Sequence, residues 1–311
     1  MHFIGLGIGR GQRYPGLDLS PAFARPYLRN LEKMGHRVYD HGDIVLSRKK
    51  DFTKVFNNES FRNYGWDEYK TAYDLVRLLL NEPGRLLNWG GDHSIGISTV
   101  GAFCSHFSDG HVLWIDAHGD LNIPTSSETG SVHGMPLCLL LNLEEVSSHG
   151  PAWLKNFLKP EKLIYLGLRD LDSFEEETIK RMGIKSFSYI DVKSRGIATI
   201  GREILNLTEG HPMHVSFDID CMDPGFSPST GVPVEGGGFT PNDFKELRHV
   251  LFQRSNVRSV DVVEVNPSIG TLKDVQWTYS NAFKFIEAVF AIQRPILNQN
   301  HDCYKVSQIE V

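Results

Sequence analysis

The amino-acid sequence predicts an α/β fold, a three-layer sandwich in which a mostly parallel sheet carries helices on both faces. Short apolar runs alternate with amphipathic segments along the whole 311-residue chain. Repeated strand-then-helix order is typical of parallel sheets, because a parallel strand pair needs a long crossover that a helix provides. No Pro- or Ser-rich linker, composition change or internal repeat divides the chain, so we expect a single domain over residues 1–311.

The predicted strands are short apolar runs, most of them followed by polar residues. They cover residues 2–6, 85–89, 111–116, 162–167, 213–218 and 257–264. The predicted helices between or after them cover residues 94–107, 174–182, 241–253 and 273–290. Another helix is expected at 67–80, because Tyr69, Tyr73 and Val76 recur at the spacing of one buried helix face.

Two further segments are less regular. A helix is expected from about Ser20 to Met34, with Ser20 as its N-cap and Pro21 in its first position. Residues 47–65 are polar without clear periodicity, and we expect them to form an irregular surface segment. The tail at 298–311 has little helical pattern and could be either an interface arm or disordered.

The composition is that of a soluble globular protein, with 41% hydrophobic and 23% charged residues. The formal net charge is −6, and no Lys/Arg cluster is present of the kind that contacts phosphates, which argues against a nucleic-acid partner. The apolar run at 136–143 is far shorter than the roughly 20 residues that span a bilayer. We therefore expect no membrane association, and the N-terminal apolar run predicts a strand, not a signal peptide.

The cysteines are few and widely separated. No CxxC pair occurs among the four cysteines, which are Cys104, Cys138, Cys221 and Cys303. This pattern favours reduced, small apolar side chains over disulfides or a thiolate metal site. We therefore expect the protein to be cytoplasmic.

Polar side chains gather where four predicted strands end. The clusters are, in chain order, Gly90–Ser94, Asp116–Asp120, Asp218 with Asp220, and Glu264. Residues two apart in extended chain point the same way, so Asp116, His118 and Asp120 can converge on one point. In open parallel sheets the ligand crevice lies at the carboxyl ends of the strands, where these clusters are expected.

Four carboxylates and two histidines crowded at one sheet edge require a compensating positive charge, because buried unpaired charges are costly. Carboxylates with a minority of imidazoles suit a divalent cation such as Mn²⁺, and the absence of cysteine argues against structural zinc. Six candidate ligands exceed what one catalytic ion takes, so two ions bridged by carboxylates fit better. Any one cluster alone could be a turn or a cap, whereas three clusters after three strands predict a metal site.

Together these clusters resemble the signatures of the ureohydrolase superfamily, which contains arginases, agmatinases and formimidoylglutamases. The matching motifs are GGDHS at 90–94, DAHxD at 116–120 and SxDxDxxDP at 216–224. Finer features resemble arginases in particular, namely Asn122, His133-Gly134, the Gly-Leu-Arg-Asp-Leu-Asp run at 167–172 and the Glu-Val-Asn-Pro run at 264–267. The resemblance extends from Gly11-Gln12 to the last helix and covers nearly the whole chain.

This resemblance implies an arginase/deacetylase-like fold and a hydrolase that acts on the C–N bond of an amidine. The implied reaction converts L-arginine to L-ornithine and urea through attack of a metal-bridging hydroxide on the guanidinium carbon. It also implies two Mn²⁺ per chain. One ion would be bound by His93, Asp116, Asp120 and Asp218. The other would be bound by His118, Asp116, Asp218 and Asp220, with Asp116 and Asp218 bridging the pair.

The resemblance further implies roles in catalysis and recognition. Glu264 would receive the guanidinium, His133 would act as acid, base or proton shuttle, and Asp120 would relay a proton. The amino-acid end of the substrate would be bound by Asn122, Thr129, Ser131, Asp172 and Glu175. Without the resemblance, His133 would be interpreted as a structural loop histidine. Asp172 and Glu175 would be interpreted as the acidic first turn of a helix.

Two departures from the arginase pattern concern fine specificity: Ser131 stands where arginases commonly have asparagine, and Val232 where they commonly have threonine. The nearest alternative is an agmatinase or a hydrolase of another guanidino acid. Against it, Asn122, Thr129 and Asp172 suit a substrate with α-carboxylate and α-amino groups. A binding protein without turnover is expected to have lost metal ligands, and none is lost. By family resemblance we also expect a homo-oligomer, most simply a trimer.

Overall fold

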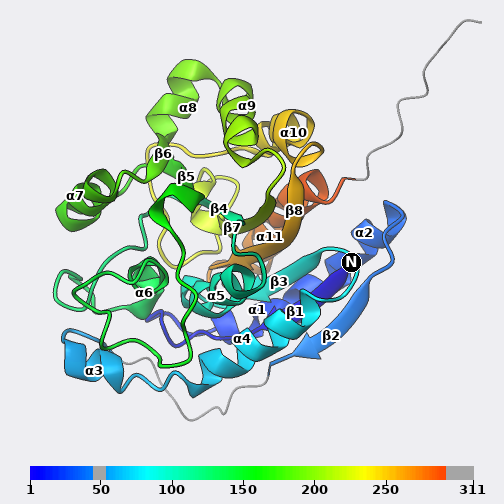
Figure 1. Ribbon diagram of the computed structural model, residues 1–311. Helices are drawn as coiled ribbons and strands as arrows, with labels where there is room; N and C mark the ends of the chain where they lie inside the picture. The colour runs from blue at the N-terminus through cyan, green and yellow to red at the C-terminus, as the bar shows by residue number, and fades with distance from the viewer. Residues whose placement is uncertain (45–53, 292–311) are drawn as a thin grey trace, which may run out of the picture.

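The computed structural model describes residues 1–44 and 54–291, and within these residues one eight-stranded sheet forms the centre of the molecule (Figure 1). The spatial order of the strands is β2-β1-β3-β8-β7-β4-β5-β6, and every neighbouring pair is parallel. The strands are β1 (His2–Leu6), β2 (Tyr39–Asp43), β3 (Leu86–Gly90), β4 (His111–Ile115), β5 (Leu163–Leu168), β6 (Lys185–Ser188), β7 (Pro212–Asp218) and β8 (Asn256–Val263).

Helices cover both faces of the sheet, which confirms the expected α/β sandwich (Figure 1). One hydrophobic core forms between one sheet face and α3 (Asn58–Arg62), α4 (Asp67–Leu79), α5 (Gly96–His106), α6 (Pro136–Leu140) and α7 (Ser173–Met182). The other core forms under α1 (Ser20–Ala24), α2 (Leu28–Lys33), α8 (Tyr189–Arg195), α9 (Ile197–Thr208), α10 (Pro241–Leu247) and α11 (Leu272–Val289). Successive strand residues alternate between the two cores, as with Leu86 and Leu87.

The central strands were predictable because both of their faces are buried, so that nearly all of their residues are apolar. The two edge strands were not predicted. β2 has the polar sequence Tyr-Asp-His-Gly-Asp and is largely exposed, and β6 has only four residues, most of them exposed or half-buried. An edge strand lacks the apolar pattern by which a buried strand is recognised.

The helix expected from Ser20 to Met34 is wrong as a single element. It is divided into α1 and α2 by a 3₁₀ turn at Arg25–Tyr27, where Pro26 has no N–H for a continuous helix. Ser20 is also not an N-cap. Its hydroxyl is buried, accepts a hydrogen bond from Trp89 Nε1 at 2.9 Å and lies 2.9 Å from the hydroxyl of Tyr279.

The segment expected to be irregular contains a short helix. Of residues 47–65, those at 47–53 lie outside the described residues, as does the whole tail at 298–311. The helix α3 begins at a capping box formed by Asn57 and Ser60, and Phe61 is fully buried. Polar capping residues obscured this pattern. No helix in the described parts of the chain is both long and apolar enough to cross a membrane.

Gly91 ties together the loops that follow three neighbouring strands. Its amide donates to Leu6 O at 3.0 Å, and its carbonyl accepts from the amide of Glu264 at 2.9 Å. A Cβ at Gly91 would lie 1.8 Å from the carbonyl oxygen of Ile8, so no larger residue fits without moving the backbone. The glycine therefore permits the close approach that places His93 and Glu264 side by side.

We predict that Gly91→Ala lowers the free energy of unfolding by about 1–3 kcal/mol, because the new methyl group overlaps the Ile8 carbonyl. Urea unfolding of the metal-free protein measures this change. Gly134→Ala is the control, since a Cβ there meets nothing within 4 Å. Equal stability of the two variants would contradict this account of the loop.

Candidate metal centre

The predicted polar clusters converge at the carboxyl ends of four adjacent strands, β3, β8, β7 and β4. His93 begins a 3₁₀ turn after β3, and Asp218 is the last residue of β7. Asp116 directly follows β4, and Asp120 adopts a left-handed backbone with φ of 49°. That unusual conformation turns Asp120 back toward the strand ends, and such strain is found mainly at functional sites.

A first group of ligand atoms surrounds His93, whose side chain is fully buried. From its Nδ1, the nearest carboxylate oxygens of Asp120, Asp116 and Asp218 lie at 2.9, 3.0 and 3.1 Å. We call these four residues the first metal position. One ring nitrogen cannot satisfy three carboxylates, so the geometry favours a cation shared among all four side chains.

A second group of ligand atoms lies beside the first. His118 Nδ1 is 3.0 Å from Asp220 Oδ2 and 3.7 Å from Asp116 Oδ1. We call Asp116, His118 and Asp220 the second metal position. Asp116 belongs to both positions, with Oδ2 near His93 and Oδ1 near His118, which is the arrangement of a bridging carboxylate. The geometry groups Asp218 with the first position, so its role as a second bridge stays a prediction.

The residues fit a metal because their lone pairs are directed at one another. His93 Nε2 lies 2.8 Å from Ser216 Oγ, and a proton on Nε2 leaves the lone pair of Nδ1 facing the carboxylates. His93 Nδ1 and Asp120 Oδ2 face each other at 2.9 Å, and neither has another hydrogen-bond partner among the described residues. Buried polar atoms are rarely left unpaired, and a cation between these two lone pairs would satisfy both.

The electrostatics of the cluster indicate the same need for a cation. Burial raises the pKa of Asp218 well above its usual value, and the carboxylates of Asp220 and Asp116 raise it further. Burial also raises the pKa of Asp220 to about 6. For His93, burial disfavours the charged ring, but the carboxylates of Asp120, Asp116 and Asp218 outweigh it and raise its pKa. Without metal, the cluster must therefore hold extra protons in place of positive ions.

Glu264 and His133 lie directly beside the first metal position. Glu264 has a left-handed backbone, with φ of 63°, and its Oε1 accepts from the amide of His93 at 3.0 Å. His133 Nδ1 is 3.3 Å from the same oxygen. Burial disfavours charge on His133, but the Glu264 carboxylate outweighs it and raises the pKa of the ring to about 9. The two side chains thus form a buried acid–imidazole pair next to the cluster.

The residues expected at the amino-acid end of the substrate lie partly together. Asn122 Nδ2 donates to Asp172 Oδ2 at 2.6 Å. Glu175 is 4% exposed and forms a capping box with Asp172 at the start of α7, so its carboxylate is already engaged with backbone amides. Ser131 is buried, and its amide donates to Thr129 Oγ1 at 3.2 Å. Within the described contacts, neither Thr129 nor Ser131 hydrogen-bonds to the Asn122–Asp172 pair.

Three residues of the site were not predicted from the sequence as site residues. Gln12 Nε2 lies 3.5 Å from Glu264 Oε2, and Trp114 stacks on the His93 ring with centroids 4.0 Å apart. Asp92 accepts from the amide of Gly11 at 2.7 Å and so fixes the loop that carries Gln12. Asp92 lies inside the GGDHS motif, and Gly11-Gln12 lies where the resemblance to the family begins. A single sequence, however, does not show which residues contact a metal ligand in the folded protein.

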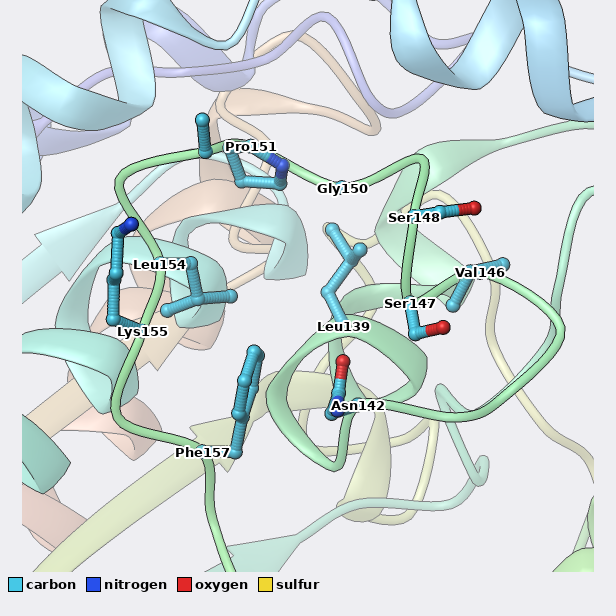
Figure 2. A pocket seen from close by; sticks show the side chains of 11 residues that line it. Leu139, Asn142, Val146, Ser147, Ser148, Gly150, Pro151, Leu154, Lys155 and Phe157 are labelled. Atoms are coloured by element: carbon cyan, nitrogen blue, oxygen red, sulfur yellow. The ribbon is translucent and has the colours of Figure 1, made fainter.

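A separate cavity of about 410 Å³ lies among the loops after α6, with Leu139, Leu154 and Phe157 pointing into it (Figure 2). None of its lining residues belongs to the metal positions or to the Glu264–His133 pair. The chemistry-bearing residues and this loop cavity are therefore distinct features of the molecule.

Comparison with known proteins gives one consistent result. Residues 1–291 match the Arginase family. Arginase-1 of Sus scrofa is 32% identical over 300 residues, which cover 94% of this chain and 92% of the relative. The arginase of Staphylococcus aureus (strain MRSA252) is 36% identical over 282 residues, covering 86% and 89%. The solved arginase of Entamoeba histolytica in complex with L-ornithine has a TM-score of 0.81 at 28% identity, covering 94% of this chain and 97% of that one.

We predict that the purified protein binds two divalent ions per chain, counted by elemental analysis after equilibrium dialysis. Asp116→Ala should abolish binding of both ions, because Asp116 offers an oxygen to each position. His93→Ala should remove one ion and spare the other. Asp74→Ala is the control, because the Asp74 carboxylate is exposed on α4 and pairs only with Lys70 among the described residues. Two ions per chain in Asp116→Ala would refute the shared-ligand geometry.

Proposed function

This chain is a member of the arginase family, and from that membership we propose that it hydrolyses L-arginine to L-ornithine and urea. One observation carries the proposal: two groups of candidate metal ligands, all buried except the partly exposed His118, share Asp116 and lie beside a buried carboxylate, Glu264. Such a site combines a place for cations with an anion that can pair with a guanidinium. The reaction needs both features.

The metal positions would be filled by Mn²⁺, since the donor set is rich in carboxylates with one imidazole in each position. The ligands would be His93, Asp116, Asp120, Asp218, His118 and Asp220, with Asp116 and Asp218 shared. When bound, such a pair of ions lowers the pKa of water toward neutrality and supplies a hydroxide nucleophile.

Glu264 would bind and orient the substrate guanidinium. Its carboxylate is held from two sides, by the His93 amide and by Gln12 Nε2. A carboxylate fixed in this way pairs with a planar guanidinium through two parallel hydrogen bonds. The pairing would hold the guanidinium carbon against the metal positions, which is catalysis by orientation.

His133 would deliver the proton that the departing ornithine amine needs. In the metal-free site the neighbouring Glu264 carboxylate raises the pKa of its ring to about 9, which favours a proton on the ring while it lies against Glu264. A protonated imidazole is a suitable general acid for an amine leaving group. Asp120 belongs to the first metal position and interacts electrostatically with His133: its charge helps to raise the pKa of His133, and that of His133 helps to lower the pKa of Asp120. Asp120 would relay the proton.

The α-amino and α-carboxylate groups of arginine would be recognised at the loop after β4. Asp172 would pair with the α-ammonium group, and its hydrogen bond to Asn122 keeps the two side chains together. Thr129 and Ser131 would contribute hydroxyl groups to the carboxylate, with a bridging water where the Ser131 side chain is short. Glu175 would support Asp172, to which its own amide donates at 3.0 Å.

We also propose that the protein is cytoplasmic and forms a homo-oligomer, most simply a trimer. The cytoplasmic location is supported by unpaired cysteines at Cys104, Cys138 and Cys221, which suit a reducing compartment. The oligomer is proposed from family resemblance. For a trimer, light scattering should give a mass near three times the 35.1 kDa of the chain. Particles of single-chain mass alone would refute the proposed homo-oligomer.

We predict that kcat/KM for arginine exceeds that for agmatine by roughly 10²–10⁴-fold, because agmatine lacks the α-carboxylate that the recognition loop would bind. Urea release from the two substrates in parallel measures this ratio. Equal turnover of the two substrates would refute the proposed role of the recognition loop, and a preference for agmatine would identify the chain as an agmatinase. The metal site would be unaffected by that result.

Asp172→Asn should raise KM for arginine by about 10–100-fold with little change in kcat, because the anion facing the α-ammonium is lost. Asparagine keeps the oxygen that caps α7, so the fold is preserved. Asp191→Asn, at the capping box of α8, is the matched control and should leave both constants unchanged. A KM that stays at the wild-type value in Asp172→Asn would remove Asp172 from the substrate site.

A further inference from the structure

Two consecutive residues after β5, Arg169 and Asp170, contact the loops that carry both ligands particular to the second metal position. Those ligands are His118 and Asp220, since Asp116 is shared with the first position. The backbone amides of Arg169 and Asp170 both donate to the carbonyl of Ala117, at 2.9 and 3.0 Å. The pair is therefore fastened to the chain between Asp116 and His118.

The Arg169 side chain holds the turn that carries Asp220. Its Nη2 donates to the carbonyl oxygens of Asp220 at 2.7 Å and Met222 at 3.2 Å, and its Nη1 donates to that of Cys221 at 3.2 Å. A further bond from Nη2 reaches Val234 O at 3.4 Å. A guanidinium has fixed, planar donors, so these bonds fix the position of the turn's backbone. They therefore also fix the point from which the Asp220 side chain extends.

The Asp170 side chain faces the ring of His118. Asp170 Oδ2 lies 3.5 Å from His118 Nε2, on the side of the ring away from the Nδ1 that faces Asp220. A carboxylate beside the outer ring nitrogen favours a proton there, which leaves Nδ1 free to bind a metal and makes it more basic. His118 is 22% exposed, so its ring has fewer packing contacts to hold it than a buried one.

The first metal position is held by other elements. His93 is fully buried, stacks on Trp114 and pairs through Nε2 with Ser216 at 2.8 Å. Neither Arg169 nor Asp170 makes a hydrogen bond or ion pair with His93, Asp120 or Asp218 among the described residues. The two positions thus share Asp116 but have separate supports.

We infer that the Arg169–Asp170 pair is the positioning element of the second metal position alone, and that it sets the affinity of that position relative to the first. The inference rests on the proposed function for the identity of the bound metal. Its consequence is that the two ions can be lost independently. Weakening this pair produces a chain with one ion bound at the His93 side.

The test is a calorimetric titration of metal-free protein with Mn²⁺, together with a count of bound ions after equilibrium dialysis. Asp170→Ala and Arg169→Gln should each weaken one of the two sites by about 10–100-fold and the other by less than about threefold. Asp170→Asn keeps an acceptor oxygen and should recover most of the loss. Cooperative thermal unfolding of the metal-free variants checks that they fold. If Arg169→Gln does not fold, the Asp170 variants alone test the inference.

Two matched controls test whether the effect is local. Asp109→Ala removes a similar surface contact, Asp109 Oδ2 to His211 Nδ1 at 3.2 Å, near the amino ends of β4 and β7. Arg85→Gln removes another arginine that donates to a backbone carbonyl, that of Val289 at 2.9 Å. Both control variants should keep two sites with affinities within about threefold of the wild type.

A double-mutant cycle identifies the site that is weakened. In a His118→Ala background, Asp170→Ala should have no further effect on Mn²⁺ affinity. The Asp170 side chain acts on the metal position only through the ring of His118, which this background lacks. In a His93→Ala background, Asp170→Ala should weaken the remaining ion by the same factor as in the wild type. Wild-type protein that binds no Mn²⁺ would overturn the proposed function. Wild-type protein with two ions, but equal weakening of both or neither in Asp170→Ala, would overturn this inference alone.

Discussion

The rest of this structure depends on the concentration of four aspartates and two histidines in one buried volume. Three carboxylate oxygens lie within 3.1 Å of a single ring nitrogen, that of His93. Such proximity is unfavourable without positive charge, since each buried ion left unpaired costs several kcal/mol. The fold must therefore hold these groups together, and the binding of cations is favourable because it relieves their mutual repulsion.

A parallel sheet is well suited to that task. Its central strands end at one edge, and the loops that follow them are joined by backbone hydrogen bonds between Gly91 and Leu6 and between Glu264 and Gly91. Asp120 and Glu264 both adopt left-handed backbones, a conformation that costs about 1–3 kcal/mol for a residue with a side chain. Packing on both faces of the sheet supplies the rigidity that maintains this strain. The packing of the apolar core thus maintains the geometry of the charged site.

Much of this was predictable from the sequence. Apolar runs such as the one before Asp116 mark buried strands, and the residue spacing after them places carboxylates on a common edge. Other features were not predictable because they depend on contacts between distant segments. The edge strand β2 has no apolar pattern, and the approach of Gln12 to Glu264 joins residues that lie at opposite ends of the chain. The contact of Asp170 with His118 is also invisible without the fold.

The central claim is that the paired metal positions and Glu264 together hydrolyse the guanidinium of arginine. The most direct test is to load metal-free protein with zero, one or two Mn²⁺ per chain and to measure urea and ornithine released from arginine. We predict equal amounts of the two products and turnover that rises steeply only as the second ion is bound. Full turnover by metal-free protein, or no urea from fully loaded protein, would contradict it.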